Sequence, residues 1–349
     1  MTQTSRPQGQ RRKKAARFSE IAARAGVSVA TVDRVLNERD SVSEAARRKV
    51  LAAARDLDVP RILPQPDHAL VHVDVLLPRN DTPFFRALTE AFRVAAAMLD
   101  RRVIVHRRQL AEGDSAAMAK ALSAPPYRRS GVIFAAPDVA VIRAAVAQAI
   151  ARGETAVAVV TALADLPGLV YCGMDNRRAG LAAGDLLGRM LGRQGRIVVM
   201  GNIGLYRGHQ DRALGFQEAI TRWPGQSVIV AETETRDDPD RCQRALRQVL
   251  AQPGPPVVAV YNTGAGSAGL VPVLASLGPE RPFWVAHEAS DDHVDLLQSG
   301  LLDLVIDQDP NGQAIAALQT VLIRAGVMED LAAVRRAELR LHTRYTVGR

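Results

Sequence analysis

From residue 69 onward, short apolar runs alternate with longer amphipathic stretches, and this alternation limits the fold more than any other feature. Apolar runs predict strands at 71–77, 103–106, 131–135, 156–161, 196–200, 227–231, 257–261 and 283–287. Stretches such as 84–99 and 139–152 have helical periodicity. Strands that alternate with helices predict parallel sheets covered by helices on both faces. The region is too long for one small sheet, so we expect an α/β domain with two lobes.

The N-terminal stretch FSEIAARAGVSVATVDRVLN has a different pattern. Two short amphipathic segments are separated by Gly26, whose permissive backbone suits a tight turn. Ser19 and Ser28 are the expected N-caps of these helices, and a third helix follows Ser43. The inward apolar positions are Ile21, Ala22, Ala25, Val32, Val35, Leu36, Val50, Leu51 and Ala54. This pattern predicts an all-α helix-turn-helix domain.

Charge is concentrated in the same region. Residues 1–61 hold 14 Lys and Arg against 7 Asp and Glu, whereas the whole chain has a net charge of +8. Such a footprint is typical of a module that binds a polyanion, although a solvated basic terminus is the alternative. In a helix-turn-helix, the second helix reads the major groove. Its predicted DNA-binding residues are Ser28, Val29, Ala30, Thr31, Arg34 and Asn37.

Chemistry assigns these six residues different tasks. The small side chains near position 30 let the backbone approach the duplex, and Arg34 can donate two hydrogen bonds to guanine. The short polar side chains of Ser28, Thr31 and Asn37 suit phosphate oxygens.

Residues 18–57 resemble the headpiece of regulators of the lac-repressor/galactose-repressor family, through IAARAGVSVATVDRVLN and VSEAARRKVLAAARDL. The resemblance implies sequence-specific operator binding by a dimer, with Val29, Ala30 and Arg34 reading bases. Asp33 stands where the family usually has serine. Its carboxylate repels phosphate unless it accepts from a cytosine amino group or pairs with a neighbouring arginine, and both alternatives stay open.

The segment that follows the headpiece contains Pro60, Pro64 and Pro66 and predicts an extended linker. The family carries a short helix here, with a leucine that wedges into the minor groove. The prolines argue against a regular helix, and Ile62 or Leu63 is left as the candidate wedge.

The remainder of the chain resembles type I periplasmic sugar-binding proteins, which this family uses as its sensor. The matching pieces are DTPFFRAL, GMDNRRAGLAAGDLLG, YRGHQDRALGFQEAI, VYNTGAG, VAHEASDDHVDLLQSG and IDQDP. The resemblance implies two lobes with a ligand between them. The expected division is a basic arm at 1–17, the DNA-binding domain at 18–60, a linker at 61–68 and the sensor at 69–349. Lobe 1 would comprise 69–174 and 308–336, and lobe 2 would comprise 175–307 and 337–349.

The expected ligand site lies where strands end, as in other open α/β sheets. Phe84 and Phe85 can stack on a sugar ring or simply pack in the core. By resemblance, Arg212, Asn262, Glu288 and Gln308 hydrogen-bond sugar hydroxyls. Thr161 replaces an aspartate that is common in the family, and Asp175 lies at the first lobe crossing. Arg207 and His209 favour a sugar acid or phosphate, unless they are solvated loop residues.

Other function classes find little support. Cys172 and Cys242 have no paired spacing, which indicates neither a disulfide nor a zinc site and fits a reducing cytoplasm. No apolar run approaches the roughly 20 residues that a bilayer requires. The adjacent carboxylates of Asp237 and Asp238, and of Asp291 and Asp292, would point apart in a regular element. We therefore expect no metal, no cofactor and no enzymatic activity.

The prediction is a cytoplasmic homodimeric regulator, most simply a repressor, of genes for carbohydrate metabolism or uptake. Its effector would be a monosaccharide, polyol or sugar acid. The alternative is a sugar-binding protein of a transport system, which would need a signal peptide and leaves residues 11–57 unexplained.

Overall fold

The computed structural model describes residues 18–37, 42–57, 70–201, 206–223, 226–232, 235, 237–328 and 337–347. The chain divides into two compact units, residues 1–69 and 70–349. The predicted arm at 1–17 and the linker at 61–68, with its prolines and its candidate wedge residues, lie outside the described residues.

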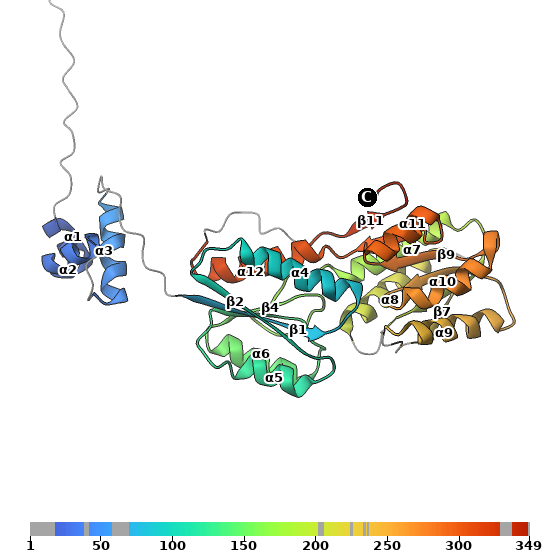
Figure 1. Cartoon of the computed structure of the whole chain (residues 1–349), viewed down its shortest axis with the longest axis horizontal. Coiled ribbons are helices and arrows are strands. Elements are labelled where there is room, and N and C mark those ends of the chain that lie inside the picture. Colours follow the sequence, from blue (N-terminus) through green and yellow to red (C-terminus); the bar gives the residue numbers. More distant parts are fainter. Residues whose placement is uncertain are drawn as a thin grey trace, which may run out of the picture. The chain divides into compact units, whose positions relative to one another are not determined.

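The first unit contains three helices, α1 (Phe18–Ala25), α2 (Val29–Leu36) and α3 (Glu44–Asp56) (Figure 1). Gly26 has a φ of +66° between α1 and α2, a conformation that favours glycine. The side chain of Ser28 caps α2 by accepting from the backbone N–H of Thr31 at 3.1 Å. The nine predicted inward positions are all buried in one core, together with Ala53. The helix-turn-helix prediction is confirmed, but the expected cap at Ser19 is wrong, because α1 begins at Phe18 and Ser19 lies inside it.

The second unit begins with a five-stranded parallel sheet in the order β2-β1-β3-β4-β5. Its strands are β1 (Val71–Arg79), β2 (Val103–Ala111), β3 (Gly131–Phe134), β4 (Thr155–Ala158) and β5 (Val170–Tyr171). One face packs on α5 (Ser115–Ser123) and α6 (Ala140–Ala151). The other packs on α4 (Pro83–Ala97) and α12 (Pro310–Arg324).

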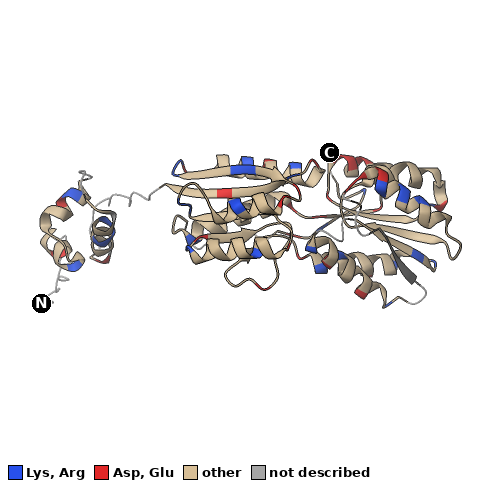
Figure 2. Cartoon of the chain, turned by 90° about the horizontal axis from the view of Figure 1, so that it is seen from below, with Lys and Arg blue, Asp and Glu red and all other residues tan. Residues whose placement is uncertain are grey.

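A six-stranded sheet follows in the order β11-β10-β9-β8-β6-β7. Its strands are β6 (Gly195–Met200), β7 (Gln226–Glu232), β8 (Val257–Asn262), β9 (Phe283–His287), β10 (Leu304–Asp307) and β11 (Arg340–His342). Helices α7 (Asn176–Met190) and α8 (Arg207–Ile220) cover one face. The other is covered by α9 (Pro239–Ala251), α10 (Ser267–Ser276) and α11 (Asp291–Ser299), and a short 3-10 turn (Gly278–Glu280) follows α10. Figure 2 shows basic and acidic residues interspersed on the helices of the second unit.

This arrangement confirms the α/β fold class with two sheets, and a strand forms at each of the eight predicted places. Strands β5, β10 and β11 were not predicted. β5 has two residues, and β11 is a three-residue polar edge strand that pairs antiparallel with β10. Helix α12 follows β10 of the second sheet in sequence but packs against the first, so the chain passes between the sheets more than once. The proposed lobe boundaries remain predictions.

Helices α7 and α8 approach each other closely because glycines face the contact. A Cβ added at Gly180 would lie 2.0 Å from the carbonyl oxygen of Arg212. At Gly184 it would lie 2.7 Å from the carbonyl oxygen of Phe216, and at Gly215 it would lie 2.2 Å from that of Arg177. Backbone therefore packs on backbone, and this contact fixes the position of α8.

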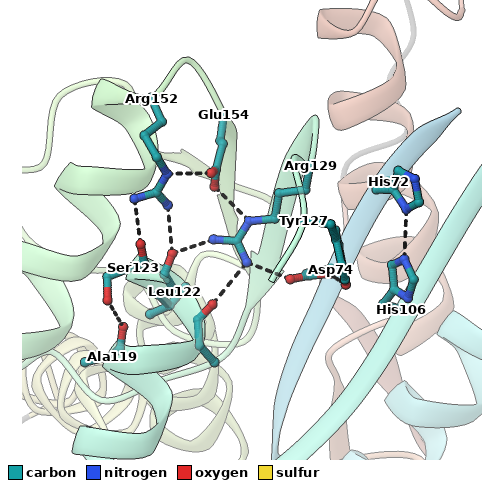
Figure 3. Close-up of polar contacts among 11 residues, drawn as sticks. His72, Asp74, His106, Ala119, Leu122, Ser123, Tyr127, Arg129, Arg152 and Glu154 are labelled. Atoms are coloured by element: carbon teal, nitrogen blue, oxygen red, sulfur yellow. Dashed lines mark hydrogen bonds and ion pairs between the residues drawn. The ribbon is translucent and has the colours of Figure 1, made fainter. Parts of the chain in front are cut away.

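A buried ionic cluster lies beside β1 in the first sheet (Figure 3). The guanidinium of Arg129 contacts Asp74 at 2.6 Å and Glu154 at 2.8 Å, and the side chains of Arg129 and Asp74 are fully buried. Tyr127 donates to Asp74 at 2.5 Å, and Arg152 donates to Glu154 at 2.7 Å. Arg129 also donates to the carbonyl oxygens of Ala121 and Leu122, at the end of α5. The cluster thus ties β1, the end of α5 and the segment before β4 together.

Candidate functional site

The first candidate surface is the outward face of α2. Ser28, Val29, Ala30, Arg34 and Asn37 are exposed, and Val29 keeps 49% of its surface accessible. Apolar Val29 is not needed by the core, so its exposure suits contact with a partner. The hydroxyl of Ser28 also contacts that of Thr31 at 2.9 Å.

Asp33, the departure from the family pattern, lies on the same helix. Its carboxylate accepts from the side-chain amide of Asn37 at 2.7 Å. One of its acceptor positions is therefore used within the helix, and a predicted phosphate donor is turned toward a carboxylate.

The second candidate site is a cavity of about 630 Å³ in the second unit. Strand ends of both sheets contribute to it, with Thr161 beyond β4, His287 at the end of β9 and Gln308 beyond β10. The start of α4, one side of α8, the start of α10 and one face of α11 complete it. This is the carboxyl edge of the parallel strands, where open α/β sheets place ligands.

Six of the eight predicted effector residues line this cavity: Phe84, Phe85, Thr161, Arg212, Glu288 and Gln308. The two phenylalanine rings form an edge-to-face pair with centroids 5.5 Å apart, and both belong to the core of the first sheet. Their two proposed roles, core packing and ligand contact, are therefore compatible.

Asp175 and Asn262 are not among the cavity-lining residues. Asp175 is exposed and caps α7 by accepting from the N–H of Arg178 at 2.9 Å. Asn262 is fully buried and donates to the carbonyl oxygen of Ala265 and the hydroxyl of Ser267, both at 3.2 Å. It thus shapes the loop at 264–266, which does line the cavity. Position in the sequence alone could not distinguish a residue that lines the cavity from one that holds a lining loop in place.

Arg212 is 2% exposed and lies at the cavity wall. Its Nε donates to Oδ1 of Asn176 at 2.8 Å, and its Nη1 donates to the carbonyl oxygen of Thr263 at 2.6 Å. These two bonds fix the guanidinium plane, and Nη2 takes part in neither of them. A held guanidinium loses little conformational entropy when it contacts a ligand.

Glu288 and Gln308 form a second polar pair. The amide nitrogen of Gln308 donates to Oε1 of Glu288. Burial, which disfavours the charged form, raises the pKa of Glu288 to about 8, and the carboxylate of Asp307 adds to this against the opposing effect of Arg212. At neutral pH Glu288 is therefore largely protonated in the unliganded protein.

Three histidines also line the cavity. Burial lowers the pKa of His209 to about 3, and it lowers the pKa values of His287 and His293 as well. His287 shares a 2.9 Å hydrogen bond with the hydroxyl of Tyr261, and Nδ1 of His293 contacts the carbonyl oxygen of Glu288 at 2.7 Å. All three are neutral at pH 7.

Backbone strain marks the same place. Val160, Asp237 and Glu288 have φ values of 68°, 57° and 76°, and all three line the cavity. Positive φ is costly for a β-branched residue such as Val160, and such strain clusters at functional sites. Side-chain bonds hold Val160 in place, because its N–H donates to Gln313 at 2.9 Å and its carbonyl accepts from Tyr171 at 3.1 Å.

The two sheets are bridged at the rim of the cavity. Tyr206, just before α8, donates to Glu112, which follows β2, at 2.7 Å. The amide of Asn80 holds both oxygens of Glu112 at 3.0 Å. The N–H of Gly208 donates to the hydroxyl of Thr161 at 3.2 Å, a second bond between the two sides. These bonds join the two sides of the cavity.

Arg207 adds no positive charge to the lining of the cavity. Arg207 does not line the cavity, and its guanidinium lies 3.6 Å from Asp138 and 3.7 Å from Asp211. His209 lines the cavity but is neutral. Tyr206, Asp292 and Asp295 also line the cavity, and none of them was predicted as a site residue. The spacing of Asp292 and Asp295 by three residues on a helix was the available signal.

Replacing Glu288 with glutamine should change how stability depends on pH. Glutamine keeps the shape but cannot ionise. In the native protein, the folded state holds the Glu288 proton up to about pH 8, whereas the unfolded chain releases it near its ordinary pKa of 4.5. Stability from this group is therefore complete below about pH 4.5 and is lost as the pH rises through 8. Urea unfolding should show the variant gaining about 3 kcal/mol over the native chain between pH 5 and pH 8. Exposed Glu280→Gln is the control, and parallel curves for native chain and Glu288→Gln would contradict the raised pKa.

Within the described ranges, no helix has the length and apolar character needed to cross a membrane. No sequence among the curated proteins matches the chain. Among solved structures, the chain is similar to GanP, a glucose-galactose binding protein from Geobacillus stearothermophilus, with a TM-score of 0.68 and 19% identity over 79% of this chain and 99% of that one.

Two further solved structures are similar. One is a solute-binding protein of an ABC transporter from Burkholderia graminis in complex with D-arabinose, with a TM-score of 0.68 and 16% identity over 80% of this chain and 98% of that one. The other, from Bacteroides fragilis, is described as a LacI transcriptional regulator, with a TM-score of 0.69 and 16% identity over 79% of this chain and 97% of that one. At these identities, the similarity shows the fold.

Family profiles match both units. Residues 18–59 match the bacterial regulatory proteins of the lacI family, and residues 73–325 match the periplasmic binding protein domain. The second match covers more than half of the chain, and the first coincides with the helix-turn-helix. The chain belongs to the periplasmic-binding-protein domain family and carries the DNA-binding domain of lacI-family bacterial regulators at its N-terminus.

Proposed function

We propose that this protein is a transcriptional regulator, most simply a repressor of carbohydrate genes in the cytoplasm, whose operator affinity responds to a small polyhydroxylated ligand. The observation that carries the proposal is the union of two parts in one chain. A helix-turn-helix with an exposed second helix is followed by a unit whose cavity is lined from two sheets. Both matched families are regulators or binding proteins, which agrees with a binding function.

The DNA contacts are assigned to the exposed face of α2. Arg34 reads a base, Val29 and Ala30 allow close approach, and Ser28, Thr31 and Asn37 contact phosphates. A homodimer would present two such helices to the half-sites of a near-palindromic operator, about one helical turn apart.

Arg34→Ala should weaken operator binding by about 1–3 kcal/mol and relax preference at one base position, because a bidentate contact to guanine is lost. The measurement is fluorescence anisotropy on an operator obtained by selection from random duplexes, compared with single-base variants. Arg34→Lys keeps the charge but not the planar fork, so it should relax the same position. An even loss over all duplexes would instead make Arg34 a phosphate contact.

The effector is assigned to the cavity. Phe84 and Phe85 offer apolar ring surface, and Arg212, Glu288 and Gln308 offer donors and acceptors to hydroxyl groups. The bridge from Tyr206 to Glu112 joins the two sides of the cavity, so ligand in the cavity would favour one arrangement of the two sheets. By thermodynamic reciprocity, operator DNA must then change ligand affinity by the same factor.

The test uses the full chain. Operator anisotropy at fixed salt is measured with and without pentoses, hexoses and polyols, and ligand binding is read independently from thermal shifts. We expect a ligand that raises the melting temperature to lower operator affinity at least fivefold. A chain that binds no duplex above random competitor would contradict the DNA-binding half. Unchanged operator affinity with a bound ligand would contradict the sensing half.

A sugar-binding protein of a transport system is the second candidate, because two of the similar structures are described as such. The operator anisotropy measurement separates the two functions. A regulator binds a specific duplex through the exposed face of α2, whereas a transport protein is expected to bind none.

A further inference from the structure

The charge of the cavity lining is uneven. Among its lining residues in the described part of the chain, Arg212 is the one Lys or Arg, whereas Asp237, Glu288, Asp292 and Asp295 contribute carboxyl groups. Arg212 already donates to Asn176 and to the backbone of Thr263. The three histidines add no charge at pH 7. An anionic ligand would therefore meet one cation that already makes two hydrogen bonds, together with the carboxyl groups of Asp237, Asp292 and Asp295.

One face of α11 carries part of this acidity. Asp292, Asp295, Leu296 and Ser299 line the cavity with the spacing i, i+3, i+4 and i+7 of a single helix face. Asp292 lies in the first turn, where the helix dipole favours a carboxylate whatever the ligand. Asp295 lies beyond that turn, so the dipole does not explain it. Both side chains are exposed at the cavity.

Two buried polar atoms at the cavity lack partners. Within the described structure, Oε1 of Gln308 and Nδ1 of His287 make no hydrogen bond, although these residues are only 4% and 1% exposed. A buried polar atom left unpaired is costly, which points to a missing partner. The carbonyl oxygen Oε1 can only accept, so its partner must be a donor.

We propose that the ligand of this cavity carries a positively charged amino group alongside its hydroxyls, as amino sugars and amino polyols do, and that the cavity rejects sugar acids. The proposal rests on the proposed function, because it names the ligand class of the same cavity. The ammonium group supplies three donors to a lining rich in acceptors. The aromatic rings of Phe84 and Phe85, which also line the cavity, can attract a cation as well. A cation near Glu288 would also favour the ionised form of this residue.

The test is isothermal titration of the full chain at pH 7 and constant ionic strength with two matched series. These are glucosamine, glucose and glucuronate, and galactosamine, galactose and galacturonate. In at least one series we expect the amine to bind at least tenfold more tightly than the neutral sugar, and the acid to show no binding. Equal or tighter binding of the neutral sugar or the acid would overturn the inference, as would no binding by any of the six.

These failures are distinguishable from failure of the proposed function. If a neutral sugar binds best and still changes operator affinity, the regulator stands and the inference falls. If the chain binds no operator, the function falls whatever the ranking of the sugars.

Two neighbouring aspartates provide a matched pair of variants. Asp295→Asn should reduce the ratio of amine to neutral-sugar affinity about two- to fivefold, the range for an exposed ion pair. Asp291→Asn removes an exposed carboxylate of the same helix that does not line the cavity, and it should leave the ratio unchanged. Both variants should melt at nearly the native temperature. An unchanged ratio in Asp295→Asn, or an equal fall in both variants, would overturn the assignment.

Discussion

Gly180→Ala is expected to destabilise the second unit by about 3 kcal/mol and to abolish the ligand response. The added Cβ would lie 2.0 Å from the carbonyl oxygen of Arg212, and 2.8 Å from the backbone nitrogen of Phe216. These are backbone atoms of α8, so no side-chain rotation can relieve the clash, and overpacking of this kind costs about 1–3 kcal/mol or more. Alanine is otherwise the better helix former, by about 1 kcal/mol. The expected loss of stability in Gly180→Ala therefore comes from the close contact between α7 and α8 alone.

The functional effect follows from what α8 carries. Gly208, His209 and Arg212 all line the cavity, and Arg212 is held by Asn176 and Thr263 on neighbouring elements. A shift of α8 by about 1 Å breaks these bonds and misplaces the guanidinium, and misplacement on this scale is costly for a preorganised site. Ligand titration should show more than a tenfold loss of affinity.

Gly192→Ala is the matched control, because a Cβ there meets nothing within 4 Å and the glycine has no positive φ. Urea unfolding and ligand titration of both variants at 25 °C check the prediction. If Gly180→Ala and Gly192→Ala had equal free energies of unfolding, α7 and α8 could move apart at little energetic cost, and the prediction would be wrong.

Elements that depend on interactions between residues close in sequence could be predicted from the sequence. Most of the first unit could be predicted because the turn at Gly26, the cap at Ser28 and the buried positions all lie within 40 residues. The eight predicted strands are apolar runs, and β3, β4, β6 and β8 are buried along their whole length. By contrast, β11 is polar and exists only because β10 accepts it as an antiparallel neighbour. No short window of sequence contains that pairing.

The candidate site was less predictable for the same reason. Arg212, Glu288 and Gln308 were found through resemblance and strand-end position, and they line the cavity. Asn262 has an equally suitable position in sequence, yet its amide is used within its own loop. Arg207 has an equally suitable charge, yet Asp138 and Asp211 engage it. Which way a polar side chain points, and which group it bonds, depends on residues tens of positions away in the sequence.

Arg129→Met is expected to cost about 3–5 kcal/mol of stability, the range for removing one partner of a buried ion pair. Asp74 and Glu154 would keep their carboxylates where Asp74 is fully buried and Glu154 is 6% exposed at its side chain. The carbonyl oxygens of Ala121 and Leu122 would lose a donor as well. Urea unfolding at pH 7 measures the loss. Arg93→Met is the control, because its partner Glu90 is exposed and such pairs contribute less than about 1 kcal/mol.

A second substitution separates the charge effect from the loss of packing. If the Asp74 carboxylate, left without a cation, causes the damage, adding Asp74→Asn to Arg129→Met should restore part of the stability, because the amide carries no charge and can still accept from Tyr127. If lost packing of the Arg129 side chain causes it, the double variant should be no more stable than Arg129→Met. The cluster lies beside β1, whereas the cavity is lined by residues beyond the ends of strands, with Phe84 and Phe85 following β1. Ligand affinity measured at low urea should therefore survive in any fraction of the variant that stays folded, which places Arg129 in the support of the sheet.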